Sequence, residues 1–267
     1  MNPNQLMLVS DMDDTLFDSR KHISDRNLNA IWEFQKKGGL FTVATGRSVI
    51  GLRPYQQMIN IQMPVILYNG SCIYDYQKKQ MIWIKQLPEC IKAYMKELAL
   101  EFPKLGIQIM TESGIYTCRP TPIYMQFVKR EGLPYTEVPE LEEFPENWIK
   151  AELTTDLMNP EALDACLGAT MPEGCRWLAT GVYSREIVAS EVSKGSAVLR
   201  YRKLFGLSDR KLCCIGDHNN DYEMIQAADV GFAVGNALEC IKDKADFIVS
   251  DNDHDAVAEA IERMEQL

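Results

Sequence analysis

Short apolar runs alternate with helix-like patterns over both ends of the chain. Leu6–Ser10 is a continuous apolar run, which is typical of a strand buried on both faces. A helix is predicted to begin at Ser24 and to end at the Gly38-Gly39 pair. Further strands are predicted at 40–44, 65–68, 212–215, 231–234 and 247–250, and further helices at 48–59, 195–205, 221–227, 238–244 and 253–264. This alternation indicates a parallel sheet with right-handed crossovers.

The pattern changes in the middle of the chain, where nine of the twelve prolines lie. A helix is predicted there over 89–102, and strand-like stretches occur at 106–110, 115–118, 151–154 and 185–188. We therefore predict an α/β fold with a doubly wound, mostly parallel sheet, into which an α+β domain is inserted. The sheet would comprise residues 1–82 and 190–267, and the inserted domain residues 83–189.

Composition and charge narrow the possible partners. The hydrophobic fraction of 46% and the charged fraction of 25% are ordinary for a globular protein. No apolar run approaches the ~18 residues of a membrane span, and no export signal is recognisable at the start. The net charge of −10 disfavours nucleic acid, which is bound largely through Lys and Arg. We expect a small-molecule partner, not nucleic acid or a membrane; the sequence indicates no oligomeric state.

The eight cysteines are scattered, and none forms a Cys-x-x-Cys pair. None of the three histidines has metal-ligand spacing from a pair of cysteines, so a zinc site is not predicted. This pattern favours reduced thiols and a cytoplasmic location.

Three predicted strands end at residues whose side chains carry a carboxylate or a hydroxyl group. Asp11 follows the first strand, Thr45 ends the second, and Asp217 follows the strand at 212–215. In doubly wound sheets, ligands bind beyond the carboxyl ends of the strands. If these strands are neighbours, the three side chains meet at one edge of the sheet.

Asp11 and Asp13 are expected to perform different tasks. The side chain of Asp11, directly at the strand end, is suited to attack phosphorus and form an aspartyl phosphate. Asp13 can give a proton to the leaving oxygen and later take one from water. Asp14 and Asp18 are interpreted as solvated acids of the loop.

The acidic residues predict a divalent metal, because carboxylates alone would repel a phosphate. Mg²⁺ prefers a few oxygen ligands together with water and substrate phosphate, and Asp11 and Asp217 are the expected direct ligands. Asp221 would hold a metal-bound water or orient Lys194. A calcium-binding loop is rejected, because Tyr222 and Ala228 occupy the positions of the required glycine and glutamate. The loop after Asp11 fails the same comparison.

Phosphoryl transfer depends mainly on positioning and on charge stabilisation. The Thr45 hydroxyl and the amides of Met12 and Gly46 can donate to phosphate oxygens, and Lys194 supplies a positive charge. Gly195 follows Lys194 and permits close approach of the backbone at a helix start.

Taken together, these motifs resemble those of the haloacid dehalogenase superfamily of phosphohydrolases, and most closely those of the Cof-like hydrolases. The matching motifs are Asp11-Met12-Asp13-Asp14-Thr15, Thr45-Gly46-Arg47, Lys194 and Gly216-Asp217-His218-Asn219-Asn220-Asp221, with Asn69-Gly70 after the third strand. The resemblance covers residues 5–82 and 188–267.

The resemblance implies a role for each of these residues. Asp11 would be the nucleophile and Asp13 the acid/base, with Mg²⁺ on Asp11, Asp217 and the Asp13 carbonyl. The implied phosphate or substrate contacts are Met12, Thr45, Gly46, Arg47, Lys194 and Asn220. One departure is Asp14, where the family usually has glycine. If the backbone requires a positive φ there, Asp is among the few alternatives that tolerate it.

The position of the insert fits the same subfamily. Only 32 positions separate Asp13 from Thr45, too few for a domain, whereas 149 separate Thr45 from Lys194. The resemblance implies that the insert is a cap that sets specificity and closes over the site during the first chemical step.

The leading hypothesis is a Mg²⁺-dependent phosphatase acting on a small phosphorylated metabolite, with a sugar phosphate favoured. A phosphomutase of the phosphomannomutase type is an alternative, because its core and cap are similar. A receiver-like module that binds Mg²⁺ and phosphate without turnover is a more distant alternative, because receivers carry no domain-sized cap.

Overall fold

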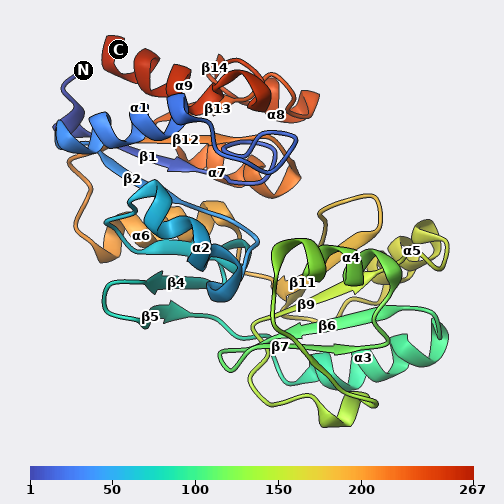
Figure 1. Cartoon of the computed structure of the whole chain (residues 1–267). Helices are drawn as coiled ribbons and strands as arrows, with labels where there is room; N and C mark the ends of the chain where they lie inside the picture. Colours follow the sequence, from blue (N-terminus) through green and yellow to red (C-terminus); the bar gives the residue numbers. More distant parts are fainter. The chain divides into compact units, whose positions relative to one another are not determined.

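A computed structural model describes all 267 residues, and the chain divides into two compact units (Figure 1). Unit 1 consists of Met1–Trp83 and Ser193–Leu267, and unit 2 consists of Ile84–Val192. Each unit has a sheet and a hydrophobic core of its own.

The main sheet of unit 1 has five parallel strands in the order β14-β13-β12-β1-β2. In chain order they are β1 (Leu6–Ser10), β2 (Leu40–Val43), β12 (Lys211–Gly216), β13 (Val230–Ala233) and β14 (Phe247–Ile248). β1 lies between β2 and β12, and all five of its residues are buried. The predicted parallel α/β sheet is confirmed; β12 is its central strand, and β1 lies next to it.

Helices cover both faces of this sheet. They are α1 (Asp25–Lys36), α2 (Val49–Ile59), α6 (Lys194–Leu204), α7 (Tyr222–Ala227), α8 (Glu239–Lys242) and α9 (Ala256–Gln266). α1 and α9 pack together on one face, and α6 and α7 on the other (Figure 1). The Ser24 side chain caps α1 by accepting a hydrogen bond from the Asn27 amide. The sheet is therefore doubly wound, as predicted.

The third predicted strand does not continue the parallel sheet. β3 (Val65–Leu67) meets it only through a parallel bridge between Ala44 and Ile66, and pairs antiparallel with β4 (Cys72–Asp75). With β5 (Gln80–Ile84) these strands form a separate three-stranded sheet. Tyr68 and Asn69 have φ values of 51° and 55°, and this left-handed backbone turns the chain back.

Unit 2 is an α+β domain. Its six-stranded sheet has the order β10-β11-β9-β6-β7-β8 and is antiparallel except for the pair β7 and β8. Its elements are α3 (Cys90–Glu101), β6 (Gly106–Met110), β7 (Ile115–Cys118), α4 (Pro122–Glu131), β8 (Thr136–Glu137), β9 (Lys150–Thr154), α5 (Pro160–Thr170), β10 (Cys175–Ala179) and β11 (Ser184–Ala189). Side chains of α3 and α5 share one hydrophobic cluster with β6 and β9. The sequence had predicted α3, β6, β7, β9 and β11, but not α4, α5, β8 or β10.

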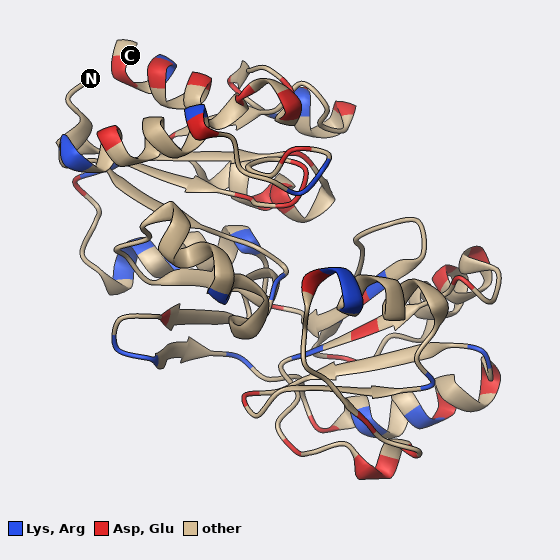
Figure 2. Cartoon of the chain, viewed as in Figure 1, with Lys and Arg blue, Asp and Glu red and all other residues tan.

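In unit 1, β1, β2 and β12 run side by side in the same direction, so their carboxyl ends meet at one edge. Figure 2 shows acidic segments, drawn red, in the loops beyond this edge. None of the helices combines the length and the apolar character that a membrane span requires.

Candidate active site

Three of the predicted residues lie at the carboxyl ends of neighbouring strands. Asp11 directly follows β1, Asp217 directly follows β12, and Thr45 follows β2 after one further residue. The Asp11 amide donates a hydrogen bond of 2.9 Å to the Ile215 carbonyl, which ties the end of β1 to β12. The register of the sheet therefore places the two aspartates next to each other.

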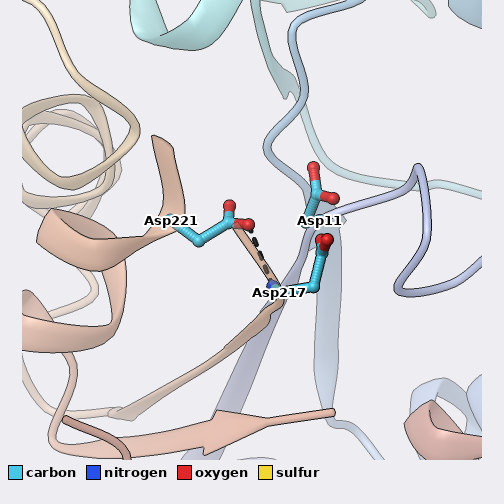
Figure 3. Close-up of side chains that lie close together, drawn as sticks. All are labelled: Asp11, Asp217 and Asp221. Carbon is cyan, nitrogen blue, oxygen red and sulfur yellow. Dashed lines mark hydrogen bonds between the residues drawn. The ribbon is translucent and has the colours of Figure 1, made fainter. Parts of the chain in front are cut away.

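A third carboxylate, that of Asp221, completes an aspartate cluster with Asp11 and Asp217 (Figure 3). One oxygen from each residue lies within 4.8 Å of the others, and all three residues are buried. Buried carboxylates at this spacing require a positive partner, because their mutual repulsion is poorly screened away from water.

Lys194 provides a positive charge inside the cluster. It is the first residue of α6, and Ser193 caps this helix. Its Nζ donates to Oδ1 of Asp11, and to Oδ1 of Asp221 at 2.7 Å. Burial alone would lower the pKa of Lys194, but the two carboxylates outweigh burial and the pKa is raised. The lysine is therefore a permanent cation.

The local backbone fixes the position of Asp221. Its Oδ2 accepts hydrogen bonds of 3.1 Å from the amides of Asp217 and His218. A β-carbon on Gly216 would lie 2.5 Å from Cγ of Asp221, so only glycine fits at that position. The same applies to Gly195, where a β-carbon would lie 2.4 Å from the Glu223 carbonyl oxygen. Gly195 thus allows α6 to approach α7 closely, and Gly216 leaves room for the Asp221 side chain beside the end of β12.

The electrostatics of the cluster suit a divalent cation. Three carboxylates and one ammonium leave a formal charge of −2. Burial raises the pKa of Asp217 to about 7, and the Asp221 carboxylate adds to the rise while Lys194 opposes it. Burial likewise raises the pKa of Asp11 well above its ordinary value, against the effect of Lys194. A site of closely spaced carboxylate oxygens fits Mg²⁺, which is bound mainly by oxygen ligands.

Thr15 contacts the aspartate cluster, although the sequence analysis assigned no role to this residue. Its hydroxyl donates a hydrogen bond of 2.9 Å to Oδ1 of Asp217, and the residue is completely buried. The motif contains this threonine four residues after Asp11, but the partner lies 202 positions away. Its role is visible only once β1 and β12 are paired.

Thr45 and Gly46 lie beside a pair of asparagine side chains. A β-carbon on Gly46 would lie 3.2 Å from the Asn69 amide nitrogen. Asn69 in turn accepts a hydrogen bond of 3.0 Å from the Asn220 side chain. The predicted substrate residue Asn220 is thus held beside the Thr45-Gly46 backbone by Asn69. The Met12 side chain is fully buried, so Met12 has only its backbone to offer a ligand.

Asp13 and Arg47 form an ion pair apart from the aspartate cluster. Nε and Nη2 of Arg47 donate to the two Asp13 carboxylate oxygens at 2.8 and 2.9 Å. The Lys21 ammonium lies 3.5 Å from Asp13 and donates to Asp14 at 2.8 Å. Burial acts to raise the pKa of Asp13, but Arg47 and then Lys21 outweigh it, and the pKa is lowered. The structure therefore places Arg47 on a carboxylate, where the sequence had predicted a phosphate or substrate contact.

Asp14 adopts a left-handed backbone with a φ of 60°. This is the conformation expected at the position where the resembled family usually has glycine. Aspartate is one of the few residues with a side chain that tolerates it at modest cost. The departure from the usual motif therefore leaves the loop geometry intact.

We expect the metal-free protein to become less stable as the pH rises from about 4 to about 7. The pKa of Asp217 is about 7 in the folded state against an ordinary value of 3.8. Between these values the folded state holds more protons than the unfolded state, so the free energy of unfolding falls as the pH rises. Urea unfolding in the presence of EDTA, at about pH 5 and about pH 8, measures the effect.

The matched variant is Asp217→Asn, which has no proton to lose at this position. It should show a smaller fall in stability over the same range, by at least about 1 kcal/mol. Asp209 is exposed and precedes the other end of β12, so Asp209→Asn should behave like the wild type. Equal pH dependence in the wild type and Asp217→Asn would contradict the prediction.

Comparison with known proteins places these motifs in a family. A sequence model described as haloacid dehalogenase-like hydrolase matches residues 8–261. Pyridoxal phosphate phosphatase YbhA of Escherichia coli is 24% identical, over 96% of this chain and 97% of its own. The 5-amino-6-(5-phospho-D-ribitylamino)uracil phosphatase YcsE of Bacillus subtilis is 27% identical, over 96% and 94%. The match includes all three residues of the aspartate cluster.

The fold is also similar to solved structures. A haloacid dehalogenase-like hydrolase from Bacteroides thetaiotaomicron superposes with a TM-score of 0.85 at 26% identity. The superposition covers 97% of this chain and 99% of the other. The similarity therefore includes the residues of both units.

Proposed function

The chain belongs to the haloacid dehalogenase-like hydrolase family, and on that premise we propose that it hydrolyses a small phosphomonoester with Mg²⁺, through an aspartyl phosphate on Asp11. Its general activity is that of a phosphoric monoester hydrolase acting on small phosphorylated substrates. The observation that carries the finer proposal is the aspartate cluster around the buried ammonium of Lys194.

The chemistry proceeds in two steps. In the first, an Asp11 carboxylate oxygen bonds to phosphorus and the bond from phosphorus to the leaving oxygen breaks, while Asp13, which in this proposal carries a proton once substrate is bound, gives that proton to the leaving oxygen. In the second, Asp13 takes a proton from water, the water oxygen bonds to phosphorus, and the bond to Asp11 breaks. Inorganic phosphate and the free alcohol are the products, and both aspartates return to their starting states.

The metal ligands in this proposal are Asp11, Asp217 and the carbonyl oxygen of Asp13. The closely spaced oxygens of the aspartate cluster support this assignment. A bound Mg²⁺ would offset the repulsion between the carboxylates and the phosphate oxygens. Asp221, which contacts Lys194 and the Asp217 amide, would hold both in place.

The phosphate oxygens would be bound by hydrogen-bond donors of the chain. These are the Thr45 hydroxyl, the amides of Met12 and Gly46, and the Lys194 ammonium. All four residues come from the strand ends or helix start that surround the aspartate cluster. Donors fixed in place by a sheet edge stabilise the charge that develops during transfer without having to reorganise.

The names of the relatives support a proposal for the substrate class. The names of YbhA and YcsE specify pyridoxal phosphate and a ribityl phosphate, and both compounds are phosphate esters of a primary alcohol. We propose that this chain also acts on a primary-alcohol phosphate, and that sugar phosphates with a terminal phosphate are the preferred group. The predicted cap, residues 83–189, would determine which of them is accepted.

Phosphate release from a panel of such esters tests this function. The expected result is Mg²⁺-dependent release of inorganic phosphate, with the highest kcat/KM for one terminal sugar phosphate. Analysis of the remaining sugar separates hydrolysis from a mutase reaction, which would yield an isomerised sugar phosphate instead. Absence of phosphate release from every ester in the panel would count against the proposal.

We expect Mg²⁺ to stabilise the folded protein. At a concentration of roughly 100 times Kd, binding to the folded state alone adds about 2.7 kcal/mol to the free energy of unfolding. Thermal unfolding with and without Mg²⁺ measures this as a rise in Tm. Asp217→Asn should lose most of the rise, because it replaces one of the proposed ligands.

Asp209→Asn is the control for the metal experiment. It removes the same charge from an exposed position near the far end of the same strand. It should retain the full Mg²⁺-dependent rise in Tm. A similar loss in both variants would show that Mg²⁺ acts on the overall negative charge and not at the aspartate cluster.

A further inference from the structure

Arg47 lies outside the aspartate cluster, yet its side chain is enclosed by unit 1 and only 6% exposed. Nε and Nη2 donate to the two carboxylate oxygens of Asp13, as described above. The third nitrogen, Nη1, lies 3.5 Å from the Gly51 carbonyl oxygen. Every side-chain nitrogen of Arg47 thus has a partner within the chain.

Two aromatic rings hold the guanidinium in this position. Its central carbon lies 4.9 Å from the centre of the Phe17 ring and 5.3 Å from that of Tyr55. The rings also contact each other edge to face, with centres 4.7 Å apart. The Arg47 amide donates to the Thr45 hydroxyl oxygen at 3.2 Å, so backbone and side chain are both fixed. Cation–π contacts and the backbone bond make this arginine a rigid support.

A rigid guanidinium fixes the plane of the carboxylate that it binds. The two parallel hydrogen bonds prevent rotation of the Asp13 carboxylate about its Cβ–Cγ bond. Each carboxylate oxygen has two lone pairs, and the arginine occupies only one on each. The Lys21 ammonium lies 3.5 Å from Oδ1, and the Asp13 side chain is 40% exposed, so a lone pair of Oδ2 remains accessible from outside.

We propose that Arg47 is a positioning residue, which holds Asp13 in the orientation needed to exchange a proton with the leaving-group oxygen. The inference rests on the proposed function, because that function gives Asp13 its acid/base role. It replaces the sequence-based expectation that Arg47 binds the phosphate or the substrate. An ammonium would perform this task less well, because it lacks the rigid planar pair of donors that matches the two carboxylate oxygens.

Two substrates of nearly equal size can distinguish positioning of Asp13 by Arg47 from phosphate binding by Arg47. p-Nitrophenyl phosphate releases a weakly basic phenolate that needs no proton, whereas phenyl phosphate releases a more basic one that does. If Arg47 positions the acid, Arg47→Met should lower kcat/KM for phenyl phosphate at least roughly 10-fold more than for p-nitrophenyl phosphate. Both values come from one preparation, so partial unfolding of the variant cancels from the ratio.

The conservative variant and a double variant make the test sharper. Arg47→Lys keeps the charge but loses the planar pair of donors, so it should show the same selective loss as Arg47→Met. In an Asp13→Asn background, Arg47→Met should cause little further change in the ratio of the two substrates. Arg53→Met removes an exposed arginine from α2 and should leave both values of kcat/KM unchanged.

The results distinguish this inference from the proposed function itself. Equal losses on the two substrates, or a loss that persists in the Asp13→Asn background, would overturn the positioning role and favour phosphate binding by Arg47. A different result would affect the proposed function first: if Asp13→Asn alone causes no selective loss on phenyl phosphate, Asp13 is not the acid and the inference fails with it.

Discussion

Replacing Asp11 by asparagine is expected to lower kcat for phosphomonoester hydrolysis by roughly 10⁴-fold or more. The amide has nearly the size and shape of the carboxylate, but its oxygen is a poor nucleophile and cannot form the acyl phosphate. The rest of the aspartate cluster is left in place. Phosphate release measured at saturating substrate and Mg²⁺ gives the size of the loss.

A stability measurement separates this catalytic loss from a structural one. The raised pKa of Asp11 means that its ionised form is disfavoured in the metal-free fold. Asp11→Asn should therefore unfold at a denaturant concentration no lower than the wild type when EDTA is present. The wild type should also carry phosphate on the peptide that contains Asp11 when turnover is quenched with acid, and the variant should not.

Asp14→Asn is the matched control for Asp11→Asn. Asparagine also tolerates the left-handed backbone found at Asp14, and the change removes one carboxylate three positions from the nucleophile. Its kcat should stay within about threefold of the wild type, as for a surface substitution away from the chemistry. If a well-folded Asp11→Asn protein kept kcat to within tenfold, the aspartyl phosphate would have to form elsewhere or not at all.

The parallel sheet could be predicted because its strands carry a strong local signal. β1 is apolar at nearly every position since both of its faces are covered, and such a run has few alternative interpretations. The hairpin of β4 and β5 gives a weaker signal, because β5 is only partly buried and does not alternate apolar with polar residues as a half-buried strand does. α4 and α5 were missed although each begins with proline, Pro122 and Pro160, which is a favoured first residue of a helix.

The candidate site could be predicted in its residues but only partly in its contacts. Asp11, Asp217 and Lys194 were identified because each lies at the end of a strand or the start of a helix, where topology dictates position. Topology does not dictate the contacts between long side chains that come from different loops. The approach of Lys21 to Asp13 and the pairing of Arg47 with Asp13 depend on loop paths that no sequence spacing encodes.

Buried charge gives the second large prediction, which concerns Lys194. Lys194→Met should lower the free energy of unfolding by about 3–5 kcal/mol, because it leaves two buried carboxylates without their cation. Methionine has a similar length and fills most of the space of the aliphatic stem, so loss of packing contributes little. Urea unfolding in EDTA measures the change, and kcat should fall together with stability because the phosphate loses a donor.

Lys203 offers the matched control, since it is an exposed lysine near the end of the same helix α6. Lys203→Met should change the free energy of unfolding by no more than about 0.5 kcal/mol. A loss of similar size in both variants would show that helix α6 is sensitive to any change of lysine, and that the buried ion pairs have no special effect.

The charge argument also predicts a partial rescue. Adding Asp221→Asn to Lys194→Met removes one of the two stranded carboxylates, so the double variant should be more stable than Lys194→Met alone, by at least about 1 kcal/mol. The asparagine oxygen can still accept from the amides of Asp217 and His218. If the double variant were instead no more stable than Lys194→Met alone, repulsion between the stranded carboxylates would not be the reason that Lys194 is buried there.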